Sequence, residues 1–189
     1  MALLQENQLL PIVLKKFSET TCLNFQVIIF IEGSLKSLPP NTNPDNHDFD
    51  HPNSLDFDSM YECLLELYNG QETKTPVYSF SHHKIIPGEH VVLQPKPIVI
   101  FEGILSMYDE RIRNMFDLKI FINFDLDLAL ARLILRDIKE RGRDVREVLH
   151  RFHTFVKMDY HAYVKDQMNY ANLIIPGGLN NKSKLTSRG

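Results

Sequence analysis

Short apolar runs alternate with polar stretches along most of the chain. The segment Gln26–Ile31 predicts a buried strand. Pro97–Phe101 is a continuous apolar run, typical of a strand that is covered on both faces of a parallel sheet, and it ends abruptly at Glu102 and Gly103. Leu118–Asn123 predicts a second buried strand, and Leu173–Ile175 predicts a last short strand.

Helical periodicity appears between the predicted strands. Asp56 has the position of an N-cap, and Gly70 ends the helix that follows it. The apolar positions that this helix places near one face are Met60, Leu64, Leu67 and Tyr68. A second helix covers Asp125–Arg141 and stops at Gly142. Further helices are predicted over residues 9–21, 109–116 and 145–164.

Two segments break this alternation. Residues 32–58 are dense in turn-forming residues and predict a long loop, which in a compact domain is usually functional or disordered. Val77–Phe80 and Glu89–Leu93 predict a pair of short strands around a turn at Pro87 and Gly88. Buried strands that alternate with helices indicate an α/β fold, with a parallel sheet flanked by helices.

Composition narrows the class of protein. The chain has 189 residues, 43% of them hydrophobic, with a formal net charge of -3, which fits one folded domain and excludes a mainly disordered chain. Apolar runs are far shorter than a membrane helix needs, and the first residues lack a basic signal-peptide region. The two cysteines give no disulfide framework, so we expect a reducing, cytoplasmic location. The mixed charge does not favour a nucleic-acid partner.

Four segments carry residues suited to ligand chemistry. Glu102 follows a buried strand, where a carboxylate can hold Mg²⁺ or simply end the strand. The segment 135–144 holds three arginines, Arg136, Arg141 and Arg143, which suit phosphate groups or surface ion pairs with acidic neighbours. The acidic residues of 48–58, with His51, suit a metal ion, sugar hydroxyls or turn capping. The aromatic strand at 78–83 ends in histidine and suits a nucleobase.

At these four segments the chain resembles the uridine–cytidine kinases of the P-loop kinase class. The matching motifs occur in the family's order: DFDHPNSLD at 48–56, YSFSHH at 78–83, FEGILSMY at 101–108 and LRDIKERGRD at 135–144. The resemblance implies a P-loop kinase-like α/β fold and ATP-dependent phosphorylation of uridine or cytidine, with ATP and Mg²⁺ as cofactors. It also implies a possible assembly as a homo-oligomer or with a full-length kinase subunit.

The resemblance assigns a role to each matching residue. Asp50 would bind the ribose hydroxyls, Tyr78 and His83 would contact the pyrimidine, and Arg143 would line the nucleoside site. Glu102 would lie beside the phosphates and Mg²⁺. Arg136 and Arg141 would lie on a lid and neutralise charge on the transferring phosphoryl group, which is how electrostatic catalysis of this reaction works.

The sequence departs from the family on the phosphate side. The phosphate-binding loop needs two glycines five apart followed by lysine, and none of the eight glycines satisfies that spacing. Gly33 occupies the position of the family's catalytic aspartate, so no catalytic residue is intact. We therefore expect one incomplete kinase-like domain over 1–181, truncated at its N-terminus, and a tail over 182–189.

Two hypotheses about function follow. In the first, the chain is a uridine/cytidine kinase whose activity is impaired, or a fragment of an active kinase. In the second, it is a non-catalytic nucleoside-binding or regulatory relative.

Overall fold

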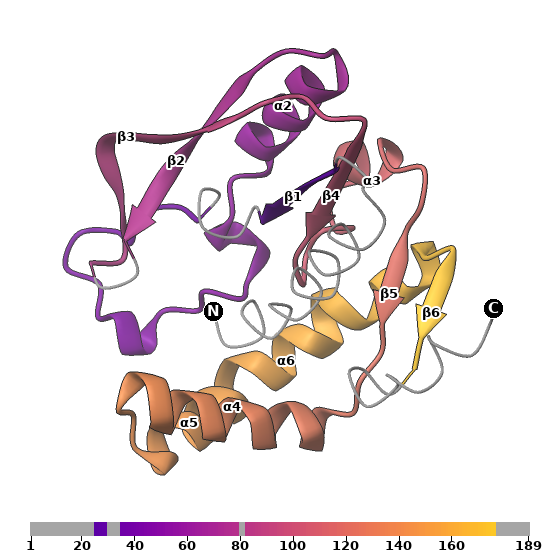
Figure 1. The fold of residues 1–189 in the computed structure, drawn as a ribbon. Helices are drawn as coiled ribbons and strands as arrows, with labels where there is room; N and C mark the ends of the chain where they lie inside the picture. The colour runs from indigo at the N-terminus through magenta and orange to yellow at the C-terminus, as the bar shows by residue number, and fades with distance from the viewer. Residues whose placement is uncertain (1–24, 30–34, 80–81, 177–189) are drawn as a thin grey trace.

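The computed structural model describes residues 25–29, 35–79 and 82–176, and Figure 1 shows their arrangement. The helix predicted over 9–21, Gly33 and the tail 182–189 lie outside these residues. In the described part the chain is α/β, with parallel strand pairs flanked by helices, as the sequence predicts.

The described part of the chain contains two separate parallel strand pairs. Strand β1 (Phe25–Ile29) pairs with β4 (Ile98–Glu102), and Val27 lies opposite Ile100. Strand β5 (Ile120–Ile122) pairs with β6 (Leu173–Ile175). All four strands were predicted. The expected burial of 98–101 on both faces is wrong, because Ile98 is 42% exposed and only Glu102 of this strand is fully buried. The expected burial of 118–123 is also wrong, because Ile120 is 40% exposed and only Phe121 of β5 is buried.

An antiparallel hairpin lies beside these strands (Figure 1). Its strands are β2 (Thr73–Ser79) and β3 (Lys84–Leu93). An antiparallel strand pair is confirmed, but the predicted turn at Pro87 and Gly88 and the predicted register are wrong, because Tyr78 lies opposite Ile85 and residues 90–93 pair with residues 73–76. The reversal falls between β2 and β3, and the Pro87–Gly88 dipeptide lies inside β3, where the register shifts opposite Val77. Gly88 has a φ of 80° there, a conformation that glycine adopts without strain.

Helix α2 (Phe57–Tyr68) packs against the hairpin. Its N-cap is Asp56, whose carboxylate accepts hydrogen bonds from the Ser59 backbone N–H at 3.1 Å and from the Ser59 hydroxyl at 2.9 Å. Met60, Leu64 and Leu67 are buried as predicted, whereas Tyr68 is 77% exposed. Tyr68 belongs to the last turn, beyond the edge of the buried face.

The remaining helices follow β4 and β5 along the chain. Helix α3 (Glu110–Asn114) is capped by Asp109, and α4 (Leu126–Arg141) ends at Gly142, with a left-handed φ of 63°. Helix α5 (Val145–Arg151) continues into two π-helical segments, Phe152–Val156 and Tyr160–Val164, around the short α6 (Lys157–Asp159). A 3₁₀ segment, Lys165–Tyr170, completes this C-terminal helical stretch, residues 145–170.

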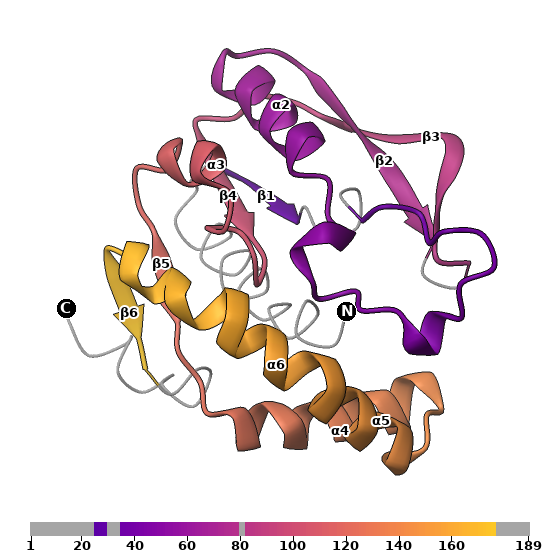
Figure 2. The ribbon, with the colours of Figure 1, turned by 180° about the vertical axis from the view of Figure 1, so that it is seen from behind.

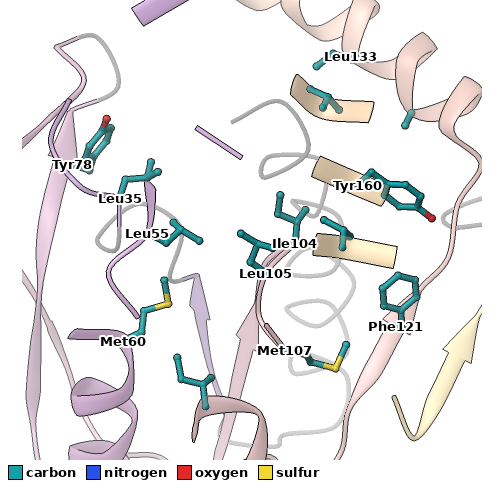
Figure 3. Packing of buried hydrophobic residues seen from close by; sticks show 14 of the residues in the cluster. Leu35, Leu55, Met60, Tyr78, Ile104, Leu105, Met107, Phe121, Leu133 and Tyr160 are labelled. Carbon is teal, nitrogen blue, oxygen red and sulfur yellow. The ribbon is translucent and has the colours of Figure 1, made fainter. Parts of the chain in front are cut away.

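One hydrophobic cluster joins these elements, and Figure 3 shows part of it. Leu35 and Leu55 pair across an isolated bridge and lie beside Tyr78, next to the side chains of α2. Ile104 and Leu105 connect this group to the helical side of the molecule. The cluster therefore fixes the long loop before α2 against both the hairpin and the segment that follows β4.

Candidate nucleoside and phosphate site

The loop over residues 44–54, called the 44–54 loop below, holds the first predicted site residue. Asp50 is 3% exposed, and its backbone N–H donates to Asp48 Oδ1 at 3.1 Å. The Ser54 hydroxyl donates to the Asp48 carbonyl at 2.6 Å. These local bonds fold the acidic segment on itself, as short polar side chains do in turns. The loop predicted over 32–58 is confirmed for residues 35–56, with two short 3₁₀ turns inside it, Pro44–Asn46 and Pro52–Ser54; residues 57 and 58 belong to α2.

An aromatic contact joins this loop to the end of the hairpin. The Phe49 ring stacks on His83, with ring centroids 5.2 Å apart and planes 27° apart, and its other neighbour His47 meets it edge-on at 4.7 Å. The His83 carbonyl accepts a hydrogen bond from the Leu38 N–H at 2.9 Å. Two of the predicted residues, Asp50 and His83, are thus brought to either end of one packed unit although they are distant in sequence.

Tyr78 lies at the end of β2, just before this unit. Its side chain is 5% exposed and belongs to the hydrophobic cluster beside Leu35 (Figure 3). Burial raises the pKa of the Tyr78 phenol above its usual value, so the hydroxyl stays protonated and able to donate a hydrogen bond.

The C-terminal helical stretch also contacts the 44–54 loop. Arg151 donates from Nη1 to the Pro44 carbonyl and from Nη2 to the His47 carbonyl, each at 3.3 Å. Tyr163 Oη lies 2.9 Å from His51 Nε2. His51 Nδ1 accepts from the Asn53 N–H, so the proton of the neutral ring is on Nε2 and is donated to Tyr163. Figure 2, which views the molecule from behind, shows the loop close to this helical stretch.

Two of the three predicted arginines converge on one buried carboxylate. Asp137 is 1% exposed and lies 2.8 Å from Arg136 Nη2 and 3.4 Å from Arg143 Nη1. The Arg143 N–H also donates to the Asp137 carbonyl at 3.1 Å, just past the glycine that ends α4. Arg141 is the last residue of α4, and its side chain lies outside the described part. Asp137 therefore sets the relative position of Arg136 and Arg143.

Glu102 lies at the carboxyl end of β4 and is 5% exposed. The segment after it is held by a buried amide. Gln167 Oε1 accepts from the Met107 N–H at 2.9 Å, and its Nε2 donates to the carbonyls of Ile104 at 2.8 Å and Tyr163 at 2.9 Å. This clamp fixes the backbone that follows Glu102 against the C-terminal helical stretch.

A third carboxyl group faces the acidic residues of the 44–54 loop. Asp159, in α6, is 5% exposed, and its pKa is raised to about 8. Burial is the main cause, followed by a hydrogen-bonding contact with Asp48 and by the negative charges of Asp48 and Asp50. The burial of His47 lowers the pKa of its imidazole, so this ring is mostly neutral at pH 7.

The structure does not assemble a metal-binding cluster from these groups. In residues 25–29, 35–79 and 82–176, no three His, Cys, Asp or Glu side chains have a metal-binding arrangement. The metal interpretation of the acidic residues at 48–58 is therefore not supported there. Glu102 remains a single carboxylate at a strand end, which fits Mg²⁺, since this ion commonly takes one or two protein carboxylates together with phosphate oxygens.

Several residues that organise this region were missed by sequence reasoning. Phe49 could have been identified, because it lies between Asp48 and Asp50 in the motif at 48–56. Arg151, Asp159 and Gln167 carry no local signal, because each acts on a partner far away in the sequence.

Solved structures show the class of fold, which is the α/β fold of kinases. The structure is similar to the "putative fructose transport system kinase" of Silicibacter sp. TM1040, with a TM-score of 0.62 and 16% identity over 84% of this chain and 78% of that one. A "possible uridine kinase" of Bacillus stearothermophilus gives a TM-score of 0.51 and 11% identity, over 86% and 78% of the two chains. At these identities the likeness concerns the fold alone.

Sequence relatives then give the family. The phosphoribulokinase / uridine kinase family model matches residues 15–184, so the chain belongs to this family. The uridine kinase of Schizosaccharomyces pombe is 39% identical over 160 residues, which are 82% of this chain and 35% of that protein. The uridine kinase of Saccharomyces cerevisiae is 42% identical over 69% of this chain and 26% of that protein, and the uridine-cytidine kinase A of Dictyostelium discoideum is 37% identical over 82% and 31%.

The chain spans about a third or less of the length of these three relatives. No helix in the part of the chain that the structure describes is long and apolar enough to cross a membrane.

Proposed function

We propose that this chain is a uridine/cytidine kinase-like protein that binds a pyrimidine nucleoside, and that its ATP-dependent conversion of uridine or cytidine to the monophosphate is impaired. The observation that carries the proposal is the packed unit of Asp50, Phe49 and His83, in which a buried aspartate directly follows a phenylalanine that stacks on a histidine from the hairpin. A carboxylate suits two vicinal hydroxyls and an aromatic surface suits a base, so the unit matches the two halves of a nucleoside.

Each predicted site residue has a role in this proposal. Asp50 accepts hydrogen bonds from the ribose hydroxyls, while Tyr78 and His83 contact the pyrimidine. Arg143 lines the same site, positioned by Asp137. Arg136 and Arg141 belong to the phosphate side, where guanidinium groups offset the charge of a transferring phosphoryl group. We also propose a cytoplasmic location and, as partners, a second copy of the chain or a longer kinase subunit.

The residues fit the two cofactors of the family unequally. Glu102 would hold Mg²⁺, which supplies charge neutralisation for phosphate oxygens when bound. The phosphates of ATP need a glycine-rich loop with a lysine, and this sequence has no glycines at that spacing. No step of a reaction is therefore assigned to ATP, and the proposal rests on the nucleoside side.

A second candidate function is a non-catalytic nucleoside-binding or regulatory relative. It is favoured by Gly33, which stands where the family has the aspartate that activates the nucleoside hydroxyl. General-base help of this kind contributes roughly 10²–10⁴ in rate, so its loss together with the glycine-rich loop suits a protein that binds without turnover.

An assay for UMP tests both candidates. The purified chain is incubated with uridine and Mg·ATP, with the Saccharomyces cerevisiae uridine kinase as a positive control, and UMP is quantified by chromatography. We expect at most trace conversion, far below the control, because the phosphate-side residues are altered. Ready conversion that disappears in Asp50→Ala would refute both the impairment and the non-catalytic alternative.

A further inference from the structure

Asp159 occupies an unusual place in the C-terminal helical stretch. It is the last residue of α6, between the two π-helical segments, and π-bulges within helices are frequent at functional sites. Its side chain is 5% exposed, and its Oδ2 has no hydrogen-bond partner in the described part of the chain. Buried carboxyl oxygens without a partner are costly, so this side chain requires an explanation.

The polar neighbours of Asp159 are themselves carboxylates. Asp48 makes a hydrogen-bonding contact with it, and the charge of Asp50 acts on it as well. Ionised carboxylates only accept hydrogen bonds, so the contact between Asp159 and Asp48 becomes a hydrogen bond only when one of them carries a proton. The raised pKa of Asp159, to about 8, is consistent with this proton residing on Asp159 at neutral pH.

The other charged and titratable groups at this contact are already engaged with the 44–54 loop. Arg151 donates to the carbonyls of Pro44 and His47, and Tyr163 pairs with His51. His47 lies near both Asp48 and Arg151, and burial lowers its pKa. Lys157, on the same short helix, is exposed. Arg151, Tyr163 and Asp159 thus contact different parts of the 44–54 loop. Of these three residues, Asp159 is the one that faces Asp48 and Asp50.

We infer that Asp159 is a positioning residue: it holds the Asp48–Asp50 segment against α6 by sharing a proton with Asp48, and so sets Asp50 in place for the ribose hydroxyls. The inference rests on the proposed nucleoside function for its second half. Loss of the proton places a third negative charge beside Asp48 and Asp50, and the repulsion loosens the acidic segment from the helix.

The consequence for stability has a definite sign. Asp159 keeps its proton in the folded chain up to a pKa of about 8, whereas an unfolded aspartate loses it near its ordinary value of 3.8. The folded state therefore binds one more proton between these two values. The contribution of Asp159 to stability is full below pH 4, falls as the pH rises toward 8, and is constant above 8.

Three variants test the inference. Asp159→Asn keeps a hydrogen-bond donor toward Asp48 and cannot ionise, while Asp166→Asn, at an exposed aspartate in the following 3₁₀ segment, is the control. Asp48→Asn removes the charge that faces Asp159 and keeps the inference testable if Asp159→Asn does not fold. Each protein is followed by thermal unfolding from pH 5 to 9 and by cytidine titration at pH 7 and 9, because the cytosine base loses no proton in this range.

We expect the melting temperature of Asp159→Asn to gain steadily on that of the unmodified chain from pH 5 to 8, and the difference to stay constant above 8. Asp48→Asn should move the levelling point to a lower pH, and Asp166→Asn should follow the unmodified chain. Cytidine affinity of the unmodified chain should fall about fivefold or more between pH 7 and 9, while that of Asp159→Asn stays unchanged.

The two readouts fail separately. A melting-temperature difference that does not vary with pH would overturn the positioning role. If the melting-temperature difference depends on pH but no cytidine binds, the Asp159–Asp48 contact is supported and the proposed nucleoside function is refuted. Cytidine affinity that falls equally in the unmodified chain and in Asp159→Asn would contradict the link to Asp50.

Discussion

Gln167 shows how one side chain sets the backbone beside a candidate site. Its amide satisfies the Met107 N–H and the Ile104 carbonyl, which belong to the segment directly after Glu102, and it also donates to the Tyr163 carbonyl. The side chain is 3% exposed, so none of these bonds competes with solvent. The position of Glu102 therefore depends on a residue in the last helical segment.

Replacing the Gln167 amide should destabilise the fold. Gln167→Ala leaves a buried N–H and a buried carbonyl without partners, and we expect it to lower the free energy of unfolding by roughly 2–4 kcal/mol. Urea denaturation measures this loss. The exposed Gln71 provides the matched control, since Gln71→Ala should change stability by less than about 0.5 kcal/mol. Equal effects of the two substitutions would show that the clamp does not contribute.

Residues with local partners could be predicted from the sequence, and residues with distant partners could not. Asp56 and Gly142 were identified because capping depends on the neighbouring few residues. Asp159 looks like any polar residue in a helix, because the carboxylates that shift its pKa lie over a hundred residues earlier. The roles proposed for Asp50, Tyr78, His83 and Arg143 remain predictions, while their burial and contacts are now known.

At the scale of elements, the helix ends and the positions of the strands agree with the sequence-based predictions, and the hairpin turn does not. Pro87-Gly88 is a strong turn signal, yet β3 absorbs it as an irregularity because pairing with β2 continues on both sides. The actual reversal uses His83 at a φ of 50° and has no glycine or proline to mark it. The pairing of β2 with β3, and not the local turn signal, therefore determines where the hairpin reverses.

The end of α4 offers a test at this scale. Gly142 adopts a φ of 63°, and nothing lies within 4 Å of where a Cβ would be, so a substitution there meets backbone strain and no steric clash. We expect Gly142→Ala to cost about 1 kcal/mol in the free energy of unfolding, and Gly142→Asn to cost less, because asparagine tolerates this conformation better. Chemical denaturation of both variants checks this order, and an alanine variant as stable as the asparagine variant would contradict it.

At the scale of the whole molecule, the candidate nucleoside site is built from three separated segments. In the proposed site, the 44–54 loop would supply Asp50, the end of the hairpin would supply Tyr78 and His83, and the segment after α4 would supply Arg143. The α/β class and the positions of the strands along the chain could be predicted from apolar runs, whereas the exposure of Ile98 and Ile120 could not. The docking of the loop on the C-terminal helical stretch could not, because Arg151 and Tyr163 act through tertiary contacts.

The most direct test of the account is a calorimetric titration with uridine, compared with adenosine, for the unmodified chain and for Asp50→Asn. The exposed Asp117→Asn serves as the control. The account predicts that the unmodified chain and the control prefer uridine to adenosine, and that Asp50→Asn weakens uridine binding by roughly 10–100-fold while it remains folded, since a hydrogen bond to a buried charge is lost. Absence of uridine binding in the unmodified chain, or equal affinity in Asp50→Asn, would contradict it.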